Sequence, residues 1–297
     1  LFAGLLIRNL CFLILWYFSV NSVSLDDGTW TYELLNGSDV VLTGCLEACP
    51  PDLVIPSSIS GRNVTRIGDE AFFKSQISSV SIPGSINYIG SLAFRETPLT
   101  NVTIPEGVVA IESQAFINSQ LTNITLPNSL ISIAGGAFSG NQLTSVVIPP
   151  GVSRIADSVF SENQLTEITI PDGVTAIEDH AFYDNKLTSA TISESVTRIG
   201  SGAFFANQLV EVTFLGDRPV LVRESFAANG DFNINYCEGR DGWPGNEIYG
   251  GLNYLTPISI NCFIDTDEDG VEDRLDAFPL DPTETMDTDS DGIGNNA

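Results

Sequence analysis

The chain has 297 residues, and its 38 acidic residues against 12 basic ones give a formal net charge of −26 at pH 7. A polyanionic chain of this kind repels nucleic acid and anionic membranes, so we expect neither as a partner. The single histidine, His180, stands at a repeat position that elsewhere holds glutamine, glycine or serine, and no phosphate loop or Cys–His pair stands out. We therefore expect an exposed His180 and a protein that is not an enzyme.

Residues 1–24 have the features of a secretory signal peptide. Arg8 precedes an apolar run from Leu10 to Val20, and small polar residues follow it. The run is shorter than the roughly 20 apolar residues that a membrane-spanning helix needs. The sequence therefore predicts export without membrane insertion of the mature chain, with a retained anchor as the alternative. Because the chain begins without Met, we also expect it to be a fragment.

Residues 25–54 predict a cap at the N-terminal end of the fold. Residues 29–35 and 39–43 flank Asn36-Gly37, a dipeptide typical of the tight turn in a β-hairpin. Such a hairpin covers the apolar core that the first coil of a repeat stack leaves exposed.

Residues 55–226 repeat with a period of 22 residues. Each repeat ends a short β-branched run with Ile-Pro or a variant of it, and an aromatic residue follows twelve positions after the Ile. The aromatic positions are Phe94, Phe116, Phe138, Phe160, Phe182, Phe204 and Phe226. A fixed period of this length predicts a solenoid, because one coil cannot bury its own apolar face and stacking buries it.

The copy that begins at Ile104 shows the expected layout of one coil. Residues 121–126 alternate and are rich in β-branched side chains, which predicts a strand that Pro127 ends. Such strands are expected near 80–82, 102–104, 124–126, 146–148, 168–170, 190–192 and 212–214. A second extended piece is expected at 108–111 and a helical or 3₁₀ turn at 113–116. After the turn, we expect a buried side-chain amide or an Asx turn to satisfy the coil backbone at Asn141, Asn163, Asn185 and Asn207.

The repeated pattern L-T-x-V-T-I-P-x-x-V-x-x-I-x-x-x-A-F-x-x-N-Q resembles the BspA-like class of bacterial leucine-rich repeats over about residues 55–226. The resemblance implies a β-rich, right-handed leucine-rich repeat solenoid with one parallel sheet and short second strands. Members of this class are mostly secreted or on the cell surface, and several are adhesins, which implies a similar place and role here. Pro98, Val159 and Ala190 depart from the pattern without changing this expectation.

Alternate residues of the predicted strands point away from the core and form two columns of candidate binding residues. The first column contains Asn101, Asn123, Ser145, Glu167, Ser189 and Glu211. The second contains Thr103, Thr125, Val147, Thr169, Thr191 and Thr213. Threonine also suits strands for structural reasons alone.

Four cysteines remain after the signal peptide: Cys45, Cys49, Cys237 and Cys262. An even number in an exported chain indicates disulfides, with zinc binding as the weaker alternative because the chain has one histidine. About eight coils stacked at about 4.8 Å hold the two pairs roughly 40 Å apart. Since the Cα atoms of a disulfide lie within about 7 Å, we expect Cys45–Cys49 and Cys237–Cys262. The second bond pins a C-terminal cap at 227–262, where the period is lost.

Residues 263–297 contain twelve acidic residues and one arginine. The spacing of the first acidic residues fits an EF-hand-like calcium loop, in which Gly270 allows the turn and Val271 gives its carbonyl. The predicted carboxylate ligands are Asp265, Asp267, Asp269 and Asp276, and a second loop begins with Asp287, Asp289 and Asp291. The segment resembles thrombospondin type 3 repeats, which bind calcium, and we expect more of them after residue 297. A disordered acidic tail is the alternative.

These features predict a monomeric, secreted or cell-surface module that binds a protein or polysaccharide, with calcium stiffening its stalk. The alternative is a purely structural spacer that displays another domain. A more remote alternative is ice binding through the threonine column, which Val147 interrupts.

Overall fold

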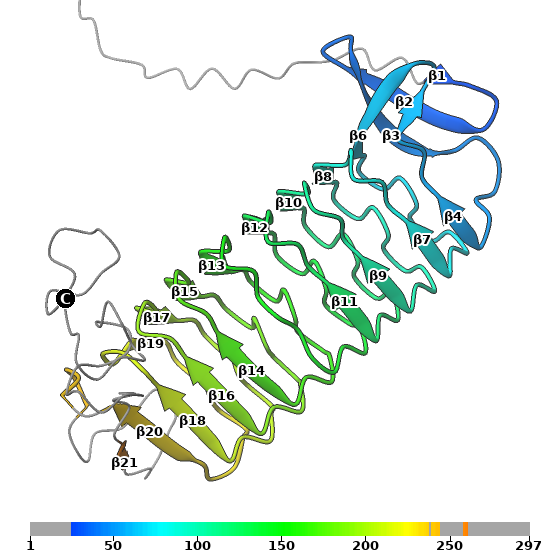
Figure 1. The fold of residues 1–297 in the computed structure, drawn as a ribbon. Coiled ribbons are helices and arrows are strands. Elements are labelled where there is room, and N and C mark those ends of the chain that lie inside the picture. Colours follow the sequence, from blue (N-terminus) through cyan, green and yellow to red (C-terminus); the bar gives the residue numbers. More distant parts are fainter. Residues whose placement is uncertain (1–24, 238, 244–257, 261–297) are drawn as a thin grey trace, which may run out of the picture.

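The computed structural model describes residues 25–237, 239–243 and 258–260, which form an elongated solenoid of stacked coils (Figure 1). Paired residues of neighbouring coils are 22 positions apart, as in the parallel pairs Ile168 with Ala190 and Ala190 with Val212. The predicted parallel solenoid is therefore confirmed. The predicted signal peptide and calcium loops lie outside the described residues.

One face of the stack is built from the longer strands. These are β4 (Asp52–Val54), β7 (Ser79–Ser81), β9 (Asn101–Thr103), β11 (Asn123–Thr125), β14 (Glu167–Ile170), β16 (Ser189–Ile192), β18 (Glu211–Phe214), β20 (Asn233–Cys237) and β21 (Ile258–Ile260). They pair in parallel as β4–β7, β9–β11 and β14–β16–β18–β20–β21. The strands begin one residue earlier than predicted, and the ladder continues past residue 226 because β20 pairs with β18 in register.

A second face is built from short strands, which form parallel sheets of their own. These are β6 (Arg62–Ile67), β8 (Tyr88–Ile89), β10 (Ala110–Ile111), β12 (Ser132–Ile133), β13 (Arg154–Ile155), β15 (Ala176–Ile177), β17 (Arg198–Ile199) and β19 (Val220–Leu221). The expectation of one sheet is thus wrong, because the short second strands extend the hydrogen-bonded ladder from coil to coil. β5 (Ser58–Ile59) adds an antiparallel pair to β6.

The third side of each coil is a turn, and the prediction of helical or 3₁₀ structure there is wrong for the described residues. Gln114 and Asn118 have left-handed backbones, with φ of 57° and 55°. Amides along this turn alternate between two kinds of acceptor: Ala115 N bonds Glu112 O within the turn, whereas Phe116 N bonds Ala137 O of the next coil. Because every second amide leaves the coil, a continuous helix cannot form.

The core follows the predicted columns. Phe72, Phe94, Phe116, Phe138, Phe160, Phe182, Phe204 and Phe226 are buried and stack ring on ring, with centroids of successive rings 4.9–5.8 Å apart. Beside them, the predicted buried amides are confirmed. Asn163 Nδ2 donates to Phe138 O at 2.9 Å, to Phe160 O at 3.2 Å and to Ser161 O at 3.1 Å. Its Oδ1 accepts from Leu143 N at 3.0 Å.

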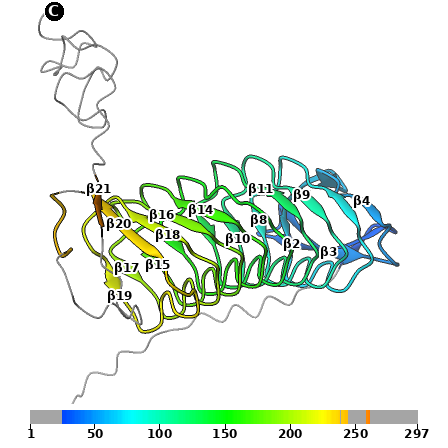
Figure 2. The ribbon, with the colours of Figure 1, turned by 90° about the horizontal axis from the view of Figure 1, so that it is seen from below.

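The predicted hairpin closes the N-terminal end of the stack (Figure 2). β2 (Trp30–Leu35) and β3 (Asp39–Cys45) are antiparallel, and Asn36 and Gly37 both have positive φ, as the tight turn requires. β1 (Leu25–Asp26) extends the hairpin, and β3 joins the short-strand sheet through β6.

A disulfide and a buried tryptophan stabilise the two ends of the stack. The predicted Cys45–Cys49 disulfide is present, with its Cα atoms 5.4 Å apart. At the other end, buried Trp243 lies 4.7 Å from Phe214 and donates from Nε1 to Gly216 O at 3.2 Å. Cys237 is buried, but Cys262 lies outside the described residues, so their pairing stays a prediction.

The stack has one irregular step, which we call the seam: residues 142–156 and their contacts with the coil before. The predicted strand at 146–148 is wrong, since these residues form no strand. The ladder of longer strands stops at β11 and restarts at β14, and the ladder of short strands stops at β12 and restarts at β13. We attribute this to Pro149-Pro150, two consecutive residues without an amide donor. At the position of Pro150 the preceding coil has Asn128, whose N donates to Glu106 Oε1.

Candidate functional site

The outer face of the longer strands carries the twelve side chains predicted from the sequence. Their outward orientation is confirmed: the first six are exposed, as are Glu167, Thr169 and Glu211, and the remaining three are half-exposed. The first six are Asn101, Thr103, Asn123, Thr125, Ser145 and Val147, and the half-exposed ones are Ser189, Thr191 and Thr213. The residues between them, such as Val102, Ile168 and Val212, are buried. Strand alternation therefore separates this face cleanly from the core.

Hydrogen-bonded register aligns these side chains along the solenoid axis. Asn101 pairs with Asn123, and Asn123 Nδ2 donates to Asn101 Oδ1 at 3.3 Å. Farther along, Glu167, Ser189 and Glu211 lie in one row. The face thus offers amides and hydroxyls in its N-terminal part and carboxylates in its C-terminal part, all of them groups that hydrogen-bond a protein or a glycan.

The seam divides this face. Val147 is 83% exposed and belongs to no strand, so the rows of threonine on either side of it are not continuous. Within the part of the chain that the structure describes, the outer face therefore carries no unbroken ladder of hydroxyls, the feature on which the ice-binding alternative rests.

The short-strand face carries charged clusters that sequence reasoning did not single out. Near its N-terminal end, the Arg66 guanidinium lies 4.8 Å from the centre of the Tyr88 ring. Burial, together with the negative charge of Glu112, raises the pKa of Tyr88 to about 12. Farther along, Glu178 accepts hydrogen bonds from Arg154 and from Arg198 Nη1, the latter at 3.1 Å. Each cluster joins side chains of neighbouring coils, so the two clusters do not contact each other.

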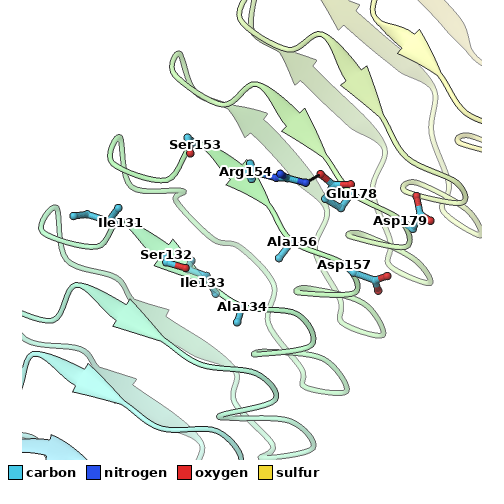
Figure 3. Close-up of a pocket in the computed structure, with 10 residues that line it drawn as sticks. All are labelled: Ile131, Ser132, Ile133, Ala134, Ser153, Arg154, Ala156, Asp157, Glu178 and Asp179. Carbon is cyan, nitrogen blue, oxygen red and sulfur yellow. Dashed lines mark hydrogen bonds and ion pairs between the residues drawn. The ribbon is translucent and has the colours of Figure 1, made fainter. Parts of the chain in front are cut away.

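A groove lies over the seam on this second face (Figure 3). It has a volume of about 640 Å³, and Ser132, Ala134 and Ala156 form part of its lining. Asp157, Glu178 and Asp179 line it as well, and Ile131 does so from the preceding coil. The sequence signal that points to this place is the second proline of Pro149-Pro150, which no other coil has at that position.

The remaining predicted residues divide into two groups. His180 is exposed, as expected, and its ring meets the edge of Tyr183 at 5.7 Å. The predicted calcium ligands and Cys262 lie outside the described residues. Among the residues that are described, no group of three or more His, Cys, Asp or Glu is placed to hold a metal ion. Nor does this part of the chain include a helix with the length and apolarity to cross a membrane.

Comparison with known proteins agrees with this architecture. The BspA type leucine rich repeat region matches residues 53–164 and 109–233, which together cover more than half of the chain. A leucine rich cell surface protein from Faecalibacterium prausnitzii A2-165 has a similar structure, with a TM-score of 0.63 and 28% identity over 73% of this chain and 71% of that one. The leucine rich repeat protein of T. pallidum has a TM-score of 0.51 and 25% identity over 61% of this chain and 88% of that one. No curated protein matches the sequence. On the match of the repeat region, the chain belongs to the BspA-type leucine-rich repeat family.

Proposed function

We propose that the protein is an exported, cell-surface module that binds a protein or glycan through the outer face of the longer strands. The observation that supports this most is the two columns of outward side chains, eleven of the twelve polar, of which the strand register aligns ten on the two sides of the seam. A rigid scaffold limits the entropy that its binding groups lose when a ligand orders them. The similar structure from Faecalibacterium prausnitzii A2-165 is described as a cell surface protein, which supports the same location here.

Truncation of the face tests this proposal. The triple variant Asn123→Ala, Thr125→Ala and Thr169→Ala removes polar groups on both sides of the seam without touching the core. We expect binding of the labelled full chain to cell surfaces and to a glycan microarray to weaken at least tenfold. The matched control is Gln142→Ala with Gln208→Ala, two exposed positions off this face, and it should bind like the parent.

The spacer alternative predicts a different outcome for the same experiment. A structural spacer shows no saturable binding to any surface or glycan, and the triple variant then behaves like the parent. Equal losses in the triple variant and the control would also rule out this face as the binding site.

We further propose that residues 263–297 form a calcium-binding stalk. The support is the ligand spacing at Asp265, Asp267, Asp269 and Asp276, with Gly270 at the turn. Carboxylates packed this closely repel one another, so a bound cation stabilises the compact form of the segment. Calcium removal should therefore expand the tail and leave the repeats folded, because repeat stability is local.

Calorimetry on the calcium-depleted full chain checks this. We expect saturable heat with a Kd on the order of 10⁻⁴ to 10⁻³ M, as in extracellular calcium modules. The double variant Asp267→Ala with Asp269→Ala should lose the heat of the first loop, whereas Asp52→Ala, an exposed carboxylate on β4, should not. Identical heats in all three proteins would leave the segment as an acidic linker.

A further inference from the structure

The seam leaves backbone groups without partners on the short-strand face. In a regular step, an amide of each coil bonds a carbonyl of the coil before, as in Ile131 N to Val109 O at 3.0 Å. Two coils farther along, the bonds are regular again, with Thr175 N to Ser153 O at 2.9 Å and Glu178 N to Ile155 O at 2.8 Å. Between these, the described chain contains neither corresponding bond, from Ser153 N to Ile131 O or from Ala156 N to Ile133 O.

The coils at the seam remain attached on the turn side, although both strand ladders are interrupted there. On the turn side Gly136 N bonds Asp157 O and Phe138 N bonds Val159 O, both at 2.9 Å. The Phe138 and Phe160 rings are 5.7 Å apart, as in the regular steps. The unpaired groups therefore lie in the groove of about 640 Å³, a volume within the usual range for ligand sites.

The charged side chains that line the groove are one arginine and three carboxylates. Arg154 is the one cation in its lining, and Figure 3 shows its side chain directed to Glu178 on the following coil, away from Ile131 and Ser132. Asp157 is exposed at the rim. Asp179 lies beside it with its side chain 44% exposed, where its Oδ1 is 3.9 Å from Arg198 Nη2 and accepts from Ser201 N at 2.8 Å. Ile131 is 64% exposed and provides an apolar contact on the opposite side.

We propose that this groove binds an extended peptide segment that carries lysine or arginine side chains. The peptide backbone would bond the free amides of Ser153 and Ala156 and the free carbonyls of Ile131 and Ile133, as a strand added to a sheet does. Its cationic side chains would face Asp157 and Asp179. The acidic segment 263–297 of this chain has the wrong charge for the site. The site lies on a different face from the binding surface proposed above and does not depend on it.

The test uses the full chain and a capped peptide of about five residues in which lysine alternates with valine. We expect saturable binding by fluorescence anisotropy with a Kd below about 1 mM. A peptide of the same sequence with alternate amides N-methylated should not bind, because it has lost its donors. The same pattern with glutamate in place of lysine should not bind either.

Two variants separate groove binding from general attraction to an acidic protein. Ala156→Arg fills the groove and adds a positive charge, and the fold tolerates a long side chain there because Glu112 and Glu178 occupy the same position in other coils. It should weaken peptide binding at least tenfold. Val220→Arg adds the same charge on the same face, three coils away, and should leave the affinity unchanged.

Hydrogen exchange of the parent protein gives an independent readout. The amides of Ser153 and Ala156 should exchange quickly in the free protein and slow at least tenfold when the lysine–valine peptide is saturating. The proposal fails if no peptide binds at about 1 mM, if the N-methylated peptide binds equally well, or if the two arginine variants weaken binding to the same extent.

Discussion

Replacing Phe138 with alanine is expected to lower the free energy of unfolding by about 3–5 kcal/mol. The Phe138 side chain is fully buried, with its ring 5.5 Å from that of Phe116 and 5.7 Å from that of Phe160. The substitution leaves a cavity in the middle of the stack. The coils cannot close around it because hydrogen bonds of the turns, Phe116 N to Ala137 O and Phe138 N to Val159 O, hold their spacing. It also removes two ring contacts from the column.

The matched control is Thr125→Ala on β11, where the side chain is exposed and the cost should stay below about 1 kcal/mol. Urea unfolding followed by circular dichroism gives both values. Tryptophan fluorescence reports on the ends of the stack, because Trp30 is half-buried in the N-terminal hairpin and Trp243 is buried against the last coils. Equal losses in the two variants would contradict the division into core and outer face.

Replacing Asn163 with alanine is expected to lower the free energy of unfolding by about 1–3 kcal/mol, although the side chain is small and polar. Its side chain is buried, where Oδ1 accepts from Leu143 N and Nδ2 donates to Phe138 O, Phe160 O and Ser161 O. The substitution leaves Leu143 N without a partner, and an unsatisfied buried group costs about 1–3 kcal/mol. Each of the three carbonyls keeps one other donor: Asn141 Nδ2 for Phe138 O, Asn185 Nδ2 for Phe160 O and Gly140 N for Ser161 O. The same residue type makes the same bonds at Asn185 and Asn207.

Two further substitutions at this position test whether the lost stability comes from the hydrogen bonds of the side-chain amide. Asn163→Asp keeps the shape but turns three donated bonds into contacts between a carboxylate and carbonyl oxygens, so it should destabilise more than alanine. Asn163→Ser should destabilise less, because Ser119 holds this position two coils earlier and donates to Phe94 O at 2.6 Å. Chemical denaturation measures all three variants. An alanine variant as stable as the parent would show that the amide column fills space without satisfying the backbone.

Much of the fold follows from the period and chemistry of the repeats. The phenylalanine column, the buried asparagine and the Asn36-Gly37 hairpin are all predictable, because each rests on a residue type with one strong physical preference. The left-handed turn residues Gln114 and Asn118 are not, since their own preference is for right-handed backbone. They adopt the left-handed conformation because the neighbouring coils supply hydrogen bonds to every second amide. No single repeat contains that information.

The two candidate sites also differ in how far the sequence alone predicts them. Strand alternation was enough to place Thr103 and Thr125 on the outer face. The groove at the seam required the structure, because it arises from hydrogen bonds that are missing between Ile131 and Ser153. Pro150 marks the place in the sequence, but a proline alone does not tell which ladder opens or which face becomes accessible.

The seam also determines how the stack responds to force. The backbone hydrogen bonds between coils run along the solenoid axis, so a pull on the two ends loads them in series and the weakest step yields first. That step is the one before residue 153, where the sheet ladders are interrupted. Beyond it, each 22-residue coil that detaches releases roughly 70 Å of chain. A solenoid built in this way lengthens in steps under tension, beginning at its middle.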